Sequence, residues 1–322
     1  MVLMNDRGDA PCGTPRDALQ KNRKRSLPMI KFVHTAKQSL AILLGALLVV
    51  SMISGESTAA QQKAPMNSEA LRQVLKQYNT GTLADYVSVR TDKLVSFQRS
   101  LLANPDISRF KTEESKRMAM GMLGIDGFFC MAFGKNAEAA QYYEAFHRLA
   151  QELPLRDLAD IDMRPSAAME AFFKDPAGRS DAELDKMARE LDQKMLANFD
   201  KLASTHEGID FAVDLFYGSE IEAIYLVAQM VIQSDGKSAG AIATLAAEEK
   251  NIAFVEKMIA AVESDPMQKK ISEVPEKKAI LNPVMKTLKR RDGKLGRAEA
   301  AVILKTVSTE RKKIANGTIV GK

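Results

Sequence analysis

The sequence has few of the residues from which common active sites are built. It contains no tryptophan, two cysteines and three histidines in 322 residues. It also lacks a glycine-rich phosphate loop, a nucleophile elbow, zinc-ligand spacing and a haem-attachment motif. Nucleophilic hydrolases and most zinc enzymes need histidine or cysteine at defined spacings, so these classes are unsupported. We expect no cofactor and interpret the chain as a binding protein rather than an enzyme, although chemistry based on carboxylates stays open.

The low cysteine content also excludes an internal disulfide in the mature protein. Cys12 precedes the export signal described below, which leaves Cys130 as the one thiol after it. The neighbours of Cys130 are Phe129 and Met131, and a cysteine in apolar surroundings is unreactive. We predict a buried, inert side chain.

Sequence patterns typical of β-strands are missing as well. No stretch sustains the alternation of apolar and polar residues that marks a half-buried strand, whereas apolar residues recur at helical spacing through most of the chain. A composition of 46% apolar and 27% charged residues is that of a globular protein. The predicted fold class is therefore all-α, as a multi-helix bundle or a short array of helical hairpins.

Start and stop signals divide the chain into helices. Thr112 is placed to cap a strongly apolar helix that Gly134 ends, and Ser219 forms a capping box with Glu222 at the start of another. The predicted helices cover residues 68–78, 83–102, 113–133, 136–153, 167–173, 182–203, 209–217, 219–232, 239–263, 266–289 and 297–313.

Residues 40–53 form a largely apolar run of 14 residues without a charge. Lysines precede this run and small residues follow it, which is the order of a bacterial signal peptide. The run is also shorter than the roughly 18 to 20 residues that span a membrane. We therefore assign residues 29–60 as a signal peptide, cleaved after Ala59 or Ala60, and expect a periplasmic or secreted protein.

Two further interpretations concern this leader. If it is not cleaved, residues 38–54 would anchor the protein in the inner membrane, with flanking side chains reaching the interface. Residues 1–28 are polar and end in a basic cluster. We interpret them as a dispensable or wrongly assigned N-terminal extension, with translation starting at Met29.

Charge is unevenly distributed behind the leader. Residues 61–267 hold 23 basic and 32 acidic side chains, whereas residues 268–322 hold 15 and 5. We therefore divide the mature chain into an acidic helical domain and a basic helical C-terminal region at this point.

The densest basic cluster of the C-terminal region would bind an anionic membrane or cell-wall surface, or dock on the acidic part of the same chain. It comprises Lys289, Arg290, Arg291, Lys294 and Arg297. Nucleic acid is not expected as a ligand, because the cluster lacks aromatic residues for stacking.

Recurring sequence blocks favour an internal duplication that relates residues 83–153 to residues 181–234. The blocks Gly124-Ile125-Asp126, Phe133-Gly134 and Glu138-Ala139 recur with the same spacing as Gly208-Ile209-Asp210, Tyr217-Gly218 and Glu222-Ala223. Duplicated hairpins would place Asp126 and Asp210 in one shared ligand pocket, because a carboxylate in apolar surroundings needs a polar partner. In the alternative interpretation, each aspartate caps its own helix.

Glu144 and His147 form a candidate metal site. Their spacing places a carboxylate and an imidazole on one helix face, as in carboxylate-bridged metal bundles. No second pair of this kind occurs, so other carboxylates would have to complete the site. The alternative is an ordinary solvated pair on a helix surface.

These observations favour an exported, non-catalytic helical protein that binds a ligand or a partner protein in the periplasm of a Gram-negative bacterium. A metal-binding protein or enzyme that uses Asp126, Asp210, Glu144 and His147 is the first alternative. A structural protein attached to a membrane or cell wall through the basic cluster is the second.

The assignment of the leader makes a testable prediction. Replacing Leu47 with Arg places a charge in the apolar run and should abolish export, because signal peptides need an uninterrupted apolar segment. The wild-type protein should yield a periplasmic product that begins at residue 60 or 61, measured by mass spectrometry of cell fractions. Gln38→Arg, which adds charge to the flank that is already positive, should be exported normally. A membrane-bound product that retains residues 38–54 would support the anchor instead.

Overall fold

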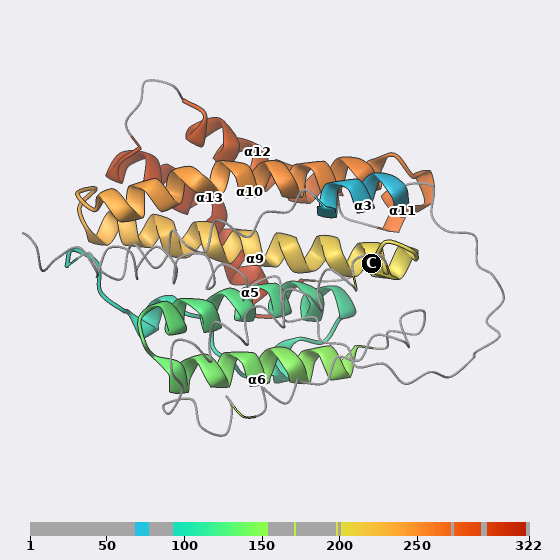
Figure 1. The fold of residues 1–322 in the computed structure, drawn as a ribbon, viewed down its shortest axis with the longest axis horizontal. Helices are drawn as coiled ribbons and strands as arrows, with labels where there is room; N and C mark the ends of the chain where they lie inside the picture. The colour runs from blue at the N-terminus through green and yellow to red at the C-terminus, as the bar shows by residue number, and fades with distance from the viewer. Residues whose placement is uncertain are drawn as a thin grey trace, which may run out of the picture. The chain divides into compact units, whose positions relative to one another are not determined.

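The computed structural model describes residues 68–76, 93–153, 171, 198, 201–271, 274–290 and 295–319. Within these residues it contains eight α-helices, two short 3-10 turns and no strand, so the predicted all-α class is confirmed (Figure 1). The helices are α3 (Ser68–Lys76), α5 (Glu113–Ala132), α6 (Asn136–Glu152), α9 (His206–Gln233), α10 (Ala239–Glu263), α11 (Pro266–Ile271), α12 (Val274–Leu288) and α13 (Arg297–Ala315). The proposed leader, the possible anchor and residues 1–28 lie outside the described residues.

Helix α9 is the centre of the bundle. It packs against α5, α10, α11 and α13, and Figure 1 shows it between α5 and α10. Its side chains are apolar around most of the helix, which is typical of a helix that is covered on all sides. Among the described helices, it alone is long and apolar enough to cross a membrane, but 78% of its most apolar window is buried by protein, as in the core helix of a folded domain.

The other helices form layers around this core. α6 packs on the side of α5, α3 packs on α10, and α12 packs on both α10 and α13. The helices of the basic C-terminal region therefore lie directly against those of the acidic region. Thr112 also joins the end of the chain to α5, because its hydroxyl donates to the Ile319 carbonyl at 3.3 Å.

Several helix ends follow the predicted signals. The Thr112 hydroxyl accepts a hydrogen bond from the Ser115 amide at 3.1 Å and caps α5, and Gly134 follows the helix with a φ of 69°. A residue with positive φ is usually glycine, since a side chain would be strained there. The same capping bond joins Thr205 to Gly208 in α9 and Ser238 to Ala241 in α10.

The prediction of two helices over residues 209–232 is wrong. α9 continues through Gly218, and the Ser219 hydroxyl donates to the Leu215 carbonyl at 2.9 Å instead of capping a new helix. Gly218 allows the backbones of two helices to approach closely, because a Cβ atom at this position would lie 2.1 Å from the Met118 carbonyl oxygen of α5. The glycine is there for packing rather than for a helix end.

Two other predicted helices also differ from the structure. Residues 93–102 contain one 3-10 turn and no α-helix, because the backbone groups of Leu101 and Ala103 bond to side chains of the core. The helix predicted over residues 266–289 is divided into α11 and α12. The remainder of the helix predicted over residues 83–102 lies outside the described residues.

The fold does not show the predicted duplication. Gly124 to Asp126 lie in the middle of α5, whereas Gly208 to Asp210 lie in the first turn of α9. Gly134 follows the end of a helix, whereas its sequence match Gly218 lies inside one. The matching sequence blocks therefore occupy different places in the structure.

The contact at Gly218 predicts the effect of a small substitution. Gly218→Ala should lower the free energy of unfolding by about 1–3 kcal/mol, because the added methyl group would push two helix backbones apart. Alanine is normally the better helix former, so Gly240→Ala in the first turn of α10 should be neutral or slightly stabilising. Urea unfolding of both variants measures the difference. Equal stabilities would contradict the close approach of α5 and α9.

Candidate functional site

In the described part of the chain, most of the buried charged side chains lie on α9 or on the helices that pack against it. α9 buries four carboxyl groups, those of Asp210, Asp214, Glu220 and Glu222, and its sequence contains no lysine or arginine. A buried carboxylate needs a cation, hydrogen bonds or a proton. The groups that meet this need come from the helices packed around α9, and they form the four clusters described next.

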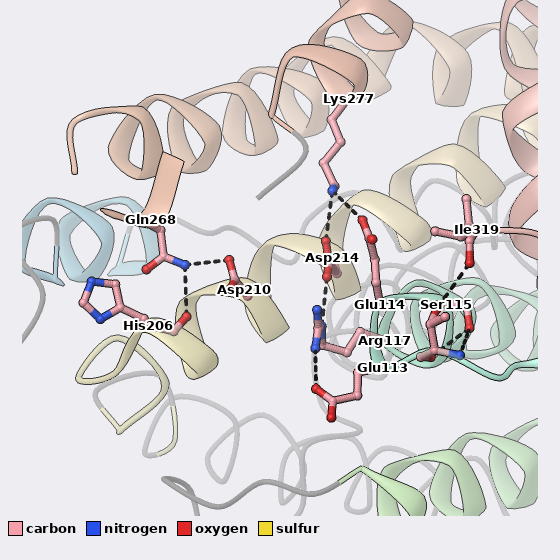
Figure 2. A network of polar contacts seen from close by, with 11 residues as sticks. Glu113, Glu114, Ser115, Arg117, His206, Asp210, Asp214, Gln268, Lys277 and Ile319 are labelled. Carbon is pink, nitrogen blue, oxygen red and sulfur yellow. Dashed lines mark hydrogen bonds and ion pairs between the residues drawn. The ribbon is translucent and has the colours of Figure 1, made fainter. Parts of the chain in front are cut away.

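The first cluster lies between α9 and α11, and we call its residues, His206, Asp210, Asp265 and Gln268, the α9–α11 cluster. The Gln268 side-chain amide donates to Asp210 Oδ1 at 2.5 Å and to the His206 carbonyl at 3.0 Å. Asp265 begins α11 by accepting from the Met267 amide at 3.0 Å, and its Oδ2 lies 3.4 Å from His206 Nε2. Figure 2 shows the Gln268 side chain between His206 and Asp210.

The second cluster surrounds Asp214, one turn further along α9. Asp214 accepts from Arg117 Nε of α5 at 2.8 Å and pairs with Lys277 Nζ of α12 at 3.1 Å (Figure 2). Lys277 also pairs with Glu114 at 3.2 Å. Burial alone would lower the pKa of Arg117 and of Lys277, but the charge of Asp214 raises both above their usual values. These charges join three helices.

The third cluster joins α5, α9 and α13. Arg311 Nε and Nη2 donate to the two oxygens of Glu222, each at 2.8 Å, and Nη2 also donates to the Leu101 carbonyl at 2.7 Å. The guanidinium group lies 4.3 Å from the ring centroid of Tyr225. Burial would lower the pKa of Arg311, but Glu222 holds it above the usual arginine value. Asp126 completes the cluster and accepts from the Ala103 amide at 2.9 Å.

The fourth cluster is a pair of carboxyl groups between α9 and α10. Glu220 and Glu248 are both buried, and Asn251 donates to Glu248 at 2.7 Å. Burial raises the pKa of Glu220 well above its usual range, and the nearby charge of Glu248 raises it further. Glu220 therefore keeps its proton to a higher pH than an exposed glutamate does.

The structure places Asp126 and Asp210 in different clusters. Asp126 lies with Glu222 and Arg311, whereas Asp210 lies with Gln268, and the Asp214 cluster comes between them along α9. The expected shared pocket is therefore not formed. Asp126 does not cap a helix either, because it lies in the middle of α5.

Glu144 and His147 do not converge on one open face of α6. Glu144 is exposed, whereas His147 is buried and its ring packs edge-on against Phe146 with centroids 5.6 Å apart. Neither the proposed metal site nor the alternative solvated pair describes this arrangement. In the described part of the chain, no three histidine, cysteine, aspartate or glutamate side chains are arranged to hold a metal ion.

The basic cluster is only partly described. Lys289 and Arg290 are exposed at the end of α12, while Arg291 and Lys294 lie outside the described residues. Arg297 pairs with Asp235 at 2.5 Å, on the loop that follows α9. Binding of an anionic surface by this cluster stays a prediction. The thiol of Cys130 is buried, as expected, and burial raises its pKa, which disfavours the reactive thiolate.

Sequence reasoning missed the cations that neutralise α9, although a signal for them was present. Arg311 falls on the same helical stripe as Ile303, Val307 and Ile314, which are all buried. A charged residue within an apolar stripe is expected to meet a buried partner of opposite charge. Lys277 falls in the same way between Val274 and Leu281 on the buried face of α12.

Comparison with protein-family models, with curated proteins and with solved structures finds no match to this chain.

The third cluster predicts a large effect of one substitution. Arg311→Met should lower the free energy of unfolding by about 3–5 kcal/mol, because it leaves Glu222 buried without its cation. Lys312→Met, which removes a charge from the exposed neighbouring position, should change stability little. Chemical denaturation of both variants tests this difference. If both were as stable as the wild type, Arg311 would not hold α13 in place.

Proposed function

We propose that this chain is an exported helical protein that binds a ligand or partner without converting it chemically, and that the α9–α11 cluster forms the binding site. The proposed export rests on the leader at residues 29–60, and it implies action in the periplasm or outside the cell. We propose that the chain is not catalytic because its buried cations serve the packing of the helices. Arg117, Lys277 and Arg311 are all engaged in ion pairs that hold helices together.

One observation carries the choice of site. Gln268 Oε1 is a buried polar atom that no hydrogen-bond donor reaches, and His206 Nε2, which is also buried, has only its 3.4 Å contact with Asp265. Buried polar atoms are usually satisfied, and an exception indicates a strained, functional or solvent-filled place. The His206 side chain is 27% exposed, and Met267, which precedes Gln268 in the chain, is 60% exposed. The cluster therefore lies close to solvent.

The chemistry of the cluster indicates the class of ligand. Gln268 Oε1 accepts hydrogen bonds, and the carboxylates of Asp210 and Asp265 make the surroundings negative. Exposed Met267 offers a flexible apolar contact of the kind found at adaptable binding surfaces. We therefore propose a small molecule or peptide end that combines an amine or amide donor with an apolar group.

A thermal-shift screen tests this site. Exported protein would be mixed with amine- and amide-bearing small molecules and short peptides, and binding should raise the melting temperature as ligand stabilises the folded state. The shift should be lost in Gln268→Leu and in His206→Phe. It should persist in Gln141→Leu, which makes the same change at an exposed position of α6.

Two results would contradict the proposal. A shift that survives both cluster variants would place the binding site elsewhere. Conversion of the bound molecule to a new product, detected by mass spectrometry after incubation, would identify an enzyme.

A further inference from the structure

The third cluster contains two carboxyl groups and one cation. The Asp126 and Glu222 side chains are fully buried, and the side chain of Arg311 is 11% exposed. Arg311 binds both oxygens of Glu222 through paired N–H groups. Asp126 Oδ2 accepts one backbone hydrogen bond, whereas Oδ1 is buried and no donor reaches it. If both acids were ionised, the cluster would carry one unbalanced negative charge.

The other groups around Asp126 are bonded elsewhere. The guanidinium group of Arg99 donates to the Ala103 carbonyl at 3.4 Å and lies over the ring of Tyr142. Tyr142 of α6 directs its hydroxyl proton to the Ala103 carbonyl at 2.7 Å, and Cys130 lies one turn further along α5 as a neutral thiol. Arg109 acts on Asp126 only through its more distant charge, because its guanidinium group bonds to the Asn104 carbonyl and lies over the ring of Phe110.

Glu222 lies beside the Asp126 carboxyl, because Arg311 binds both Glu222 and the Leu101 carbonyl, two residues before the Ala103 amide that Asp126 binds. Two carboxyl groups that share a buried site cannot both ionise without strong repulsion, and one of them then holds a proton. Glu222 is the better anion of the two, since both of its oxygens are bound by the guanidinium group.

We propose that Asp126 holds a proton through Oδ1 and donates it to the Glu222 carboxylate, so that the junction of α5, α9 and α13 is a pH-sensitive lock. In the closed state the cluster consists of neutral Asp126, negative Glu222 and positive Arg311. At alkaline pH the Asp126 O–H bond breaks and the proton passes to solvent. Two carboxylates then share one cation in a buried site, and the contact of α13 with α5 and α9 is weakened.

The direction of the pH dependence follows from the environment. Burial, with a further contribution from Glu222, raises the pKa of Asp126 well above its usual range, and Arg311 and the Ala103 amide oppose this only in part. The folded state therefore binds a proton that the unfolded chain releases. This contribution to stability is complete below the ordinary pKa of an aspartate and is lost as the pH rises through the raised pKa.

Asp126→Asn in the full exported protein tests the lock. Asparagine keeps the shape, still accepts from the Ala103 amide and donates to Glu222 at every pH. From about pH 5 to about pH 9, where an ordinary aspartate is ionised, the melting temperature of Asp126→Asn should rise steadily relative to the wild type. Asp214→Asn, at a carboxylate held by two cations, should lower the melting temperature by a similar amount throughout this range. A difference between Asp126→Asn and the wild type that is constant, or that favours the wild type at high pH, would overturn the proposal.

A second measurement covers the case in which Asp126→Asn does not fold. Infrared spectra of the Glu220→Gln variant, which removes the other buried carboxyl group with a strongly raised pKa, should show a band from a protonated carboxyl group at neutral pH. The band should disappear as the solution becomes alkaline. Its absence at neutral pH would show that Asp126 is ionised and would rule out the lock.

Discussion

The charges of α9 must be neutralised by other parts of the chain. Four carboxyl groups on this helix point into the protein, and the helix carries neither lysine nor arginine. Because a buried carboxylate without a partner is costly, each helix around α9 is constrained to bring a cation, an amide or a proton to a particular turn. α5 brings Arg117, α12 brings Lys277 and α13 brings Arg311.

These pairs fix an arrangement that apolar packing alone would leave open. α9 is apolar around most of its circumference, and such a helix can pack in several rotations. Arg117 faces Asp214, and further along the same two helices Asp126 faces Glu222. The order of the two pairs requires α5 and α9 to run in the same direction. The close contact of Gly218 with the backbone of α5 then sets their separation.

Local signals were sufficient to predict most of the described helices. Thr112 and Gly134 define α5, and the predicted span 239–263 agrees with α10, because capping and apolar periodicity are properties of neighbouring residues. Predictions failed where distant contacts decide the conformation. Residues 93–102 have helical periodicity, yet they do not form an α-helix. The Leu101 carbonyl bonds to Arg311 and the Ala103 amide bonds to Asp126 instead.

The candidate sites were harder to predict for the same reason. The apolar surroundings of Asp126 predict that it needs a partner, but Glu222 is 96 positions away in the chain and its local sequence predicts a helix cap. The sequence around Gln268 gives no signal of a site, because one neutral glutamine carries no pattern. A sequence identifies which groups need a partner, and the tertiary fold determines which partner they meet.

The position of Arg311 near the C-terminus has a consequence for the timing of folding. Glu222 and Leu101 precede their shared partner by 89 and 210 residues. Until α13 has been synthesised, the centre of the bundle lacks the cation it needs, and contacts between such distant residues form late. If the protein is exported as proposed, this order would favour translocation, because a chain that still lacks its last helix also lacks the cation that completes the centre of the bundle.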